Sequence, residues 1–140
     1  MTFSKIVILV FMLLETSNVL ALYFYPGSKY ANAVGVFSAW EKSKQYPEIH
    51  DFLRYLVNWV AGAKLIFILL LAVILFFSDL ESQRMSLLAL AIATASFFWR
   101  LFPLIRTMDK NGQIEPRNYS IVLGVMIFIF IVAFAMAVVV

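Results

Sequence analysis

Four apolar segments of membrane-spanning length restrict what this chain can fold into more than any other feature. They cover residues 6–25, 47–78, 85–107 and 119–140. About 20 mostly apolar residues in a helix cross the hydrocarbon core of a bilayer, which is about 30 Å thick. Backbone groups find almost no water there, so we expect all four segments to be helical. The prediction is an all-α membrane protein, a four-transmembrane-helix bundle forming a single integral membrane domain over residues 1–140.

The overall composition agrees with that class. Hydrophobic residues make up 64% of the chain and charged residues 14%, whereas soluble domains average about 45–50% and about 25%. The absence of cysteine excludes disulfides, thiol nucleophiles and iron–sulfur ligation. The net charge is only +3, and the basic residues gather in two loops. We therefore expect the lipid bilayer as a partner, and no nucleic acid.

The first segment also has features of a cleavable signal peptide. Lys5 precedes the apolar run Ile6–Leu14, and small residues near Ala21 could form a cleavage site. The apolar run nevertheless continues through Leu22–Tyr25 and ends at Pro26. We expect a retained transmembrane helix, with a signal peptide as the alternative.

The connection between the first and second segments is long and has its own pattern. Within residues 30–44, apolar side chains recur at helical spacing, and polar ones lie largely on the other side. The apolar set is Tyr30, Ala33, Val34, Phe37 and Trp40. This pattern predicts a short amphipathic helix at the membrane interface, with an ordinary ordered loop as the alternative. Pro47 suits the first position of the next helix.

The distribution of basic residues predicts the orientation. The loops joining segments one to two and three to four, with their flanks, carry Lys29, Lys42, Lys44, Arg54, Arg106, Lys110 and Arg117. The opposite side carries only Lys5 and Arg84. Cytoplasmic loops are enriched in lysine and arginine. We therefore expect a plasma (inner) membrane protein with both termini outside and loops 26–46 and 109–118 in the cytoplasm.

Single charges near the middle of three segments are the candidate functional residues. They are Glu15, Lys64 and Arg100, and a charge at a helix centre costs roughly 2.5–3.5 kcal/mol on insertion scales. Asn18 lies one turn after Glu15 on the same face. Arg100 shares a face with Ala89, Ala93, Ser96 and Pro103. Small residues mark close helix approach, so we expect Arg100 to point into the bundle.

Two interpretations of this charge cluster remain open. In the first, Glu15 pairs with Lys64 or Arg100 and locks the helices in register. In the second, two bases and one acid leave an excess positive charge that suits an anionic ligand or lipid head group. The residues expected to flank the cluster are Asn58, Ser96, Trp99 and Pro103. Pro103 either kinks its helix near Trp99 or marks a frayed helix end.

A transport function is the main alternative. Four helices with a glutamate in the first, at Leu14-Glu15-Thr16, superficially resemble the small multidrug-resistance transporters, which would imply an oligomeric, proton- or ion-coupled transporter using Glu15. The chain departs from that family in its long first loop and in Lys64. A glutamate neutralised by Lys64 would be a poor proton carrier.

Enzymatic and cofactor chemistry find little support in the sequence. His50 is the only histidine, and its neighbours Glu48 and Asp51 fit surface charges at a helix start better than a metal site. No phosphate-binding loop or hydrolase motif occurs. We expect no catalytic residue, metal or cofactor. The expected role is a non-enzymatic accessory subunit that contacts partners through segment 119–140 or the interfacial segment and holds a lipid or apolar anionic ligand.

Overall fold

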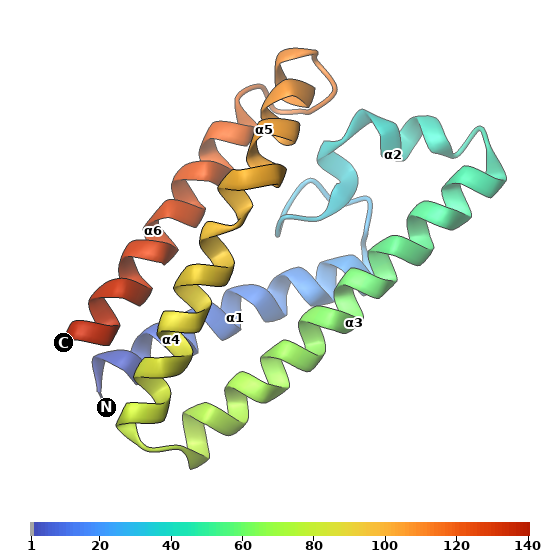
Figure 1. Cartoon of the computed structure of the whole chain (residues 1–140). Helices are drawn as coiled ribbons and strands as arrows, with labels where there is room; N and C mark the ends of the chain where they lie inside the picture. The colour runs from blue at the N-terminus through green and yellow to red at the C-terminus, as the bar shows by residue number, and fades with distance from the viewer. Residues whose placement is uncertain (1) are drawn as a thin grey trace.

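The computed structural model describes residues 2–140, which form helices joined by turns and loops (Figure 1). Five helices are long: α1 (Phe3–Phe24), α3 (Pro47–Phe77), α4 (Leu80–Ala95), α5 (Phe97–Lys110) and α6 (Tyr119–Val139). A 3-10 turn, η1 (Val34–Val36), and a short helix, α2 (Ser38–Ser43), lie between α1 and α3. No strand is longer than an isolated bridge within residues 2–140.

Four helical rods are long and apolar enough to cross a membrane by length and composition: α1, α3, the consecutive helices α4 and α5 taken together, and α6. This confirms the predicted all-α class and the four long apolar helices. Local signals explain several helix starts. The Thr2 side chain accepts a hydrogen bond from the Lys5 amide, Pro47 occupies the first turn of α3, and Asp79 caps α4 through the Ser82 amide.

The rods associate as two pairs. α1 packs along α3, and α4 packs along α6, while contacts between the pairs are fewer (Figure 1). The pairs meet at the end that holds both chain termini and the α3–α4 turn. All four rods contribute buried side chains there, including Ile8, Leu71, Leu87 and Phe134. Away from that end the two pairs diverge.

Aromatic side chains fill the common core at the terminal end. Phe134 of α6 is completely buried. The Phe11 ring of α1 lies edge-on to it, with the ring centroids 5.0 Å apart, and also contacts Phe67 and Phe130. Edge-to-face packing is a favoured arrangement of aromatic rings. This aromatic cluster joins the two helix pairs.

The two long loops are joined to each other at the opposite end. The Ser38 amide donates to the Gln113 carbonyl and the Glu115 amide to the Val36 carbonyl, each at 2.9 Å. Lys29 Nζ lies 2.9 Å from Glu115 Oε2, and this bond holds the pKa of the Glu115 carboxyl below its ordinary value. The loops that the sequence places on one side therefore lie together at one end of the helices.

The segment 30–44 contains less helix than its periodicity indicates. Ala31 and Asn32 adopt left-handed backbone angles, both with φ of 53°, which end any regular helix there. Only Ser38–Ser43 forms an α-helical turn. A side chain at Gly35 would place its Cβ 1.9 Å from the Gly27 carbonyl oxygen, so this loop folds back tightly on itself.

The third rod is interrupted at Ser96 rather than at Pro103. The Ser96 amide donates to the Ala93 carbonyl and the Trp99 amide to the Ser96 carbonyl; both bonds span three residues, as in a 3-10 turn. Pro103 lies within α5, which continues to Lys110. The alternative of a frayed end at Pro103 is therefore wrong, because the helix is ordered on both sides of it.

The aromatic core predicts a position-specific loss of stability. Replacing the fully buried Phe134 with alanine should lower the free energy of unfolding in detergent by about 3 kcal/mol or more, because it leaves a cavity. Phe128→Ala, on the same helix at a side chain that is 59% exposed, is the matched control and should cost far less. Equal losses in the two variants would show that Phe134 does not hold the pairs together.

Candidate functional site

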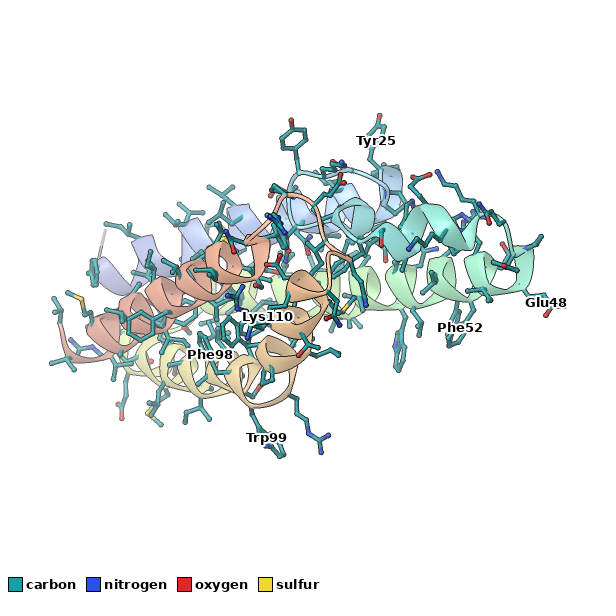
Figure 2. The ribbon with its side chains drawn as sticks, turned by 90° about the horizontal axis from the view of Figure 1, so that it is seen from above. Tyr25, Glu48, Phe52, Phe98, Trp99 and Lys110 are labelled. Atoms are coloured by element: carbon teal, nitrogen blue, oxygen red, sulfur yellow. The ribbon has the colours of Figure 1, made fainter. Side chains whose placement is uncertain are left out.

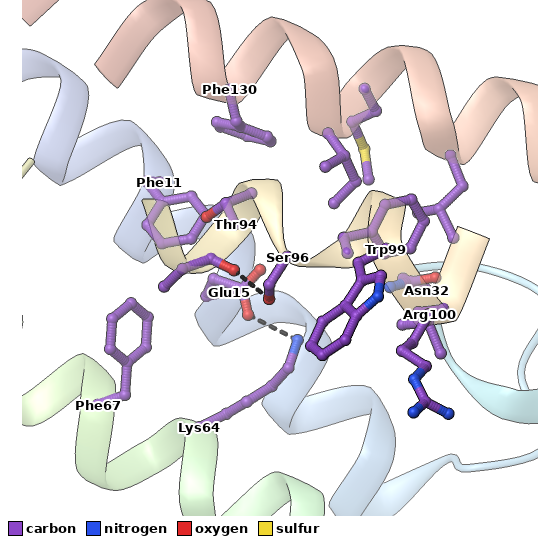
Figure 3. Close-up of a pocket in the computed structure, with 16 residues that line it drawn as sticks. Phe11, Glu15, Asn32, Lys64, Phe67, Thr94, Ser96, Trp99, Arg100 and Phe130 are labelled. Atoms are coloured by element: carbon purple, nitrogen blue, oxygen red, sulfur yellow. Dashed lines mark hydrogen bonds and ion pairs between the residues drawn. The ribbon is translucent and has the colours of Figure 1, made fainter. Parts of the chain in front are cut away.

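An ion pair joins the middle of α1 to the middle of α3. Lys64 Nζ lies 2.7 Å from Glu15 Oε2 (Figure 3). Both side chains are largely enclosed, with 22% of Glu15 and 29% of Lys64 exposed. Ala61, which precedes Lys64 on nearly the same side of α3, is fully buried. A small residue at that position lets the two helices approach closely, which brings the charges within hydrogen-bond distance.

Asn18 connects this ion pair to the loop that follows α1. Its Oδ1 accepts a hydrogen bond from Lys64 Nζ at 2.7 Å. Its Nδ2 donates to two backbone carbonyls, that of Ala31 at 2.6 Å and that of Asn32 at 2.9 Å. The side chain is buried, so the loss of these partners would strand polar groups away from water. Asn18 therefore anchors the left-handed turn of the loop to helix α1.

The turn held by Asn18 is also tied to the other helix pair. We define residues 29–32 as the strap. The Tyr119 hydroxyl at the start of α6 donates to the Asn32 side-chain oxygen, and Lys29 pairs with Glu115. A continuous polar chain thus runs from Glu15 through Lys64, Asn18 and the strap to α6. It links the two helix pairs at the end where their packing diverges.

A cavity of about 650 Å³ lies beside the ion pair, between the two helix pairs (Figure 3). Ligand pockets in proteins commonly measure about 300–1,000 Å³. Most of its wall is apolar and comes from all four rods: Phe11, Phe67, Ala93, Phe97, Trp99, Leu101, Leu123, Met126, Ile127 and Phe130. The polar groups on the wall are Glu15, Asn32, Lys64, Thr94, Ser96 and Arg100.

Two smaller cavities share polar side chains with the first. One, of about 340 Å³, is bordered by α1, the strap and α6, and includes Glu15, Asn18 and Tyr119. The other, of about 430 Å³, is bordered by α1, α3 and Leu101 of α5, and includes Lys64. Asn32 borders all three cavities. The Glu15–Lys64–Asn18 group therefore lies where apolar spaces meet.

Arg100 is separate from the ion pair. Its guanidinium lies 5.4 Å from the centre of the Trp99 ring and points away from Glu15 and Lys64 (Figure 3). Within residues 2–140 it has no carboxylate within 4.0 Å. The structure thus brings together Glu15, Lys64 and Asn18, and places Arg100 elsewhere on the wall of the same cavity.

The face of the third rod that carries Arg100 does not pack against a neighbouring helix. Its residues Ala89, Ala93, Ser96, Arg100 and Pro103 are all exposed, which corrects the expectation that small residues there mark a helix contact. The buried residues of α4 are Gln83, Leu87, Leu90 and Ala91. Because the helix pairs diverge, part of the small-residue face borders the open cavity instead.

The residues predicted to flank the cluster fall into two groups. Ser96 and Trp99 line the cavity, and the Ser96 hydroxyl donates to the Ala93 carbonyl at 2.6 Å. Asn58 is exposed on α3 and lines none of these three cavities, and neither does Pro103. Sequence reasoning missed the strap carbonyls and Tyr119, because backbone acceptors and long-range loop contacts leave no local pattern.

Metal binding finds no geometric support in the part of the chain that the structure describes. Residues 2–140 contain no group of three or more histidine, cysteine or acidic side chains arranged to hold an ion. His50 instead lies 2.8 Å from the Ser43 hydroxyl through Nδ1, next to the Trp40 ring. The Ser43 hydroxyl also donates to the Trp40 carbonyl within α2. Because Ser43 belongs to α2 and His50 to α3, the contact between their side chains attaches α2 to α3.

Comparison with known proteins supplies no relative for this chain. No protein-family model, curated protein or solved structure matches it.

The anchoring role of Asn18 is testable with a near-isosteric change. Asn18→Leu removes three hydrogen bonds and should lower the free energy of unfolding by about 1–3 kcal/mol. The amides of Ala33, Val34 and Gly35, bonded within the loop, should exchange their hydrogens faster. Asn58→Leu, at an exposed asparagine, is the control and should change neither quantity. Unchanged exchange in Asn18→Leu would refute the anchor.

Proposed function

We propose that this chain is a non-enzymatic integral membrane protein that holds a lipid or other apolar anionic ligand in the cavity between its helix pairs. The observation that carries the proposal is the cavity of about 650 Å³, whose wall is mainly aromatic and aliphatic but includes three charged side chains. Binding sites for small molecules combine an apolar wall with a few placed polar groups. A bilayer supplies ligands of matching character to a space between helices.

In this proposal the four rods cross the plasma (inner) membrane with both termini outside and loops 26–46 and 109–118 in the cytoplasm. The excess of lysine and arginine around those loops supports this orientation. The joined loops and α2 would then lie in the cytoplasmic headgroup layer, with Trp40 buried against α1 and α3. The Glu15–Lys64 ion pair would lie within the hydrocarbon core, about midway along both helices.

The same proposal makes the chain an accessory subunit of a membrane assembly. α6 carries no charged residue, and its apolar side chains Val122, Val125, Phe128, Ile129 and Met136 are exposed. This surface, or the interfacial segment, is where we expect another membrane protein to bind. The aromatic core leaves the outer face of α6 free for such a contact.

A cavity-filling substitution tests the ligand-binding proposal directly. Ala93 lines the cavity, and Ala93→Trp should exclude the ligand by occupying its space. Ala89→Trp, at an exposed alanine about one turn earlier on the same helix, is the matched control. We expect the lipid retained after detergent purification, measured by mass spectrometry, to fall at least about tenfold in Ala93→Trp, which corresponds to about 1.4 kcal/mol. Equal retention in both variants and the wild type would contradict the proposal.

The second candidate is an ion-coupled transporter that uses Glu15. It is favoured by one observation, that Glu15 borders two cavities. The ion pair with Lys64 argues against it, because the ammonium already occupies a Glu15 oxygen at 2.7 Å and gives the carboxylate a structural partner. The two candidates predict different effects of substitutions at the pair.

Substitutions of the ion pair distinguish structure from transport. Glu15→Gln leaves the Lys64 charge without its counter-ion and should lower the free energy of unfolding in detergent by about 1–3 kcal/mol. The charge swap Glu15→Lys with Lys64→Glu should recover much of that stability. In a transporter, Glu15→Gln would instead keep its stability and abolish ion-coupled flux in liposomes. That result, together with a swap that fails to restore stability, would reject the structural role.

A further inference from the structure

We infer that Arg100 is the residue that selects the ligand, and that the ligand is an amphiphile with a single negative charge. Its anionic group would lie against the Arg100 guanidinium at the edge of the cavity, and its hydrocarbon part would occupy the aromatic interior. This inference rests on the proposed function of the cavity and adds the chemical class of the ligand and the residue that recognises it.

The charge balance of the cavity wall identifies Arg100. Three charged side chains line the cavity: Glu15, Lys64 and Arg100. Glu15 and Lys64 neutralise each other at 2.7 Å, and Lys64 gives a second hydrogen bond to Asn18. Two of the three N–H groups of that ammonium are thus in use. Arg100 has no carboxylate partner within residues 2–140. The wall therefore has one uncompensated positive charge.

The position of Arg100 suits the recognition of a headgroup. Arg100 and Trp99 lie in the first turn of α5, directly after the interruption at Ser96. Trp99 is 76% exposed and points away from the bundle (Figure 2), and both side chains border the cavity (Figure 3). The guanidinium can donate two parallel hydrogen bonds to a phosphate or carboxylate.

The rest of the wall determines how an amphiphile would be oriented. Phe11, Phe67 and Phe130 lie at the deep side of the cavity, toward the aromatic core. No other uncompensated charge lines the cavity in the described part of the chain. A hydrocarbon chain directed toward these rings would leave its charged end at Arg100. One negative charge on the ligand then balances the one positive charge on the wall.

Two kinds of molecule carry this chemistry. One is a phospholipid whose phosphodiester is its only charge, as in phosphatidylglycerol, and the other is a fatty acid with its carboxylate. A zwitterionic lipid such as phosphatidylcholine has no net charge to balance Arg100. The inference therefore predicts a preference for either monoanionic amphiphile over phosphatidylcholine.

The experiment measures the affinity of the full chain for phosphatidylglycerol, oleate and phosphatidylcholine, each titrated by native mass spectrometry from detergent. We expect wild-type protein to bind at least one monoanionic amphiphile about tenfold or more tightly than phosphatidylcholine, as charge-assisted hydrogen bonds would provide. In Arg100→Gln that preference should fall to within about twofold. Arg100→Lys should keep part of it, and Arg117→Gln, at an exposed loop arginine, should keep all of it.

Each outcome has a definite meaning. A preference for phosphatidylglycerol identifies a phosphodiester lipid, and a preference for oleate identifies a fatty acid; both support the inference if Arg100→Gln removes them. An unchanged preference in Arg100→Gln would overturn it. If the wild-type protein shows no preference for a monoanionic amphiphile over phosphatidylcholine, the inference is also overturned, even if Ala93→Trp blocks binding. If Ala93→Trp leaves the binding of every amphiphile intact, the proposed cavity function itself fails. Equal melting temperatures of the Arg100 variants and the wild type exclude misfolding as the cause.

Discussion

The hydrogen-bonded pair of Glu15 and Lys64 is the contact on which the organisation of the middle of this protein depends. Neither charge is stable alone between apolar helices, because removing an ionised group from water costs several kcal/mol. At 2.7 Å the two groups satisfy each other. Their contact requires α1 and α3 to lie in one register. Asn18 fixes the loop relative to these two helices, because its side-chain amide forms hydrogen bonds with both Lys64 and the strap.

The two ends of the helices are held by different forces. At the terminal end, aromatic and aliphatic side chains of all four rods pack around the fully buried Phe134. At the loop end, polar contacts between the strap, Glu115 and Tyr119 connect the pairs. The space between these ends is only partly filled, which leaves a cavity beside the ion pair. Under the proposed function, a lipid from the bilayer would occupy this space.

Because Glu15 and Lys64 neutralise each other, their role under the proposed function differs from that of Arg100. Glu15 and Lys64 support the wall of the cavity, since their charges and most of their donors are already used. Arg100 is the charged group on that wall without a counter-ion in the described chain. Structural support and ligand recognition are thus assigned to different residues, which is why substitutions at Glu15 and at Arg100 should have different effects.

The sequence by itself determined the class of the fold, because four apolar runs of about 20 residues have few stable alternatives to long helices. It also identified Glu15, Asn18 and Lys64, since polar groups in apolar helices need partners. Only the tertiary structure decided that Lys64, and not Arg100, pairs with Glu15. It also decided that the face with Ala93 and Ser96 borders a cavity and that the rod breaks at Ser96. These outcomes depend on how the helix pairs diverge and on backbone acceptors in the strap. Helical periodicity records which residues share a face, but not which neighbour, or which empty space, that face meets.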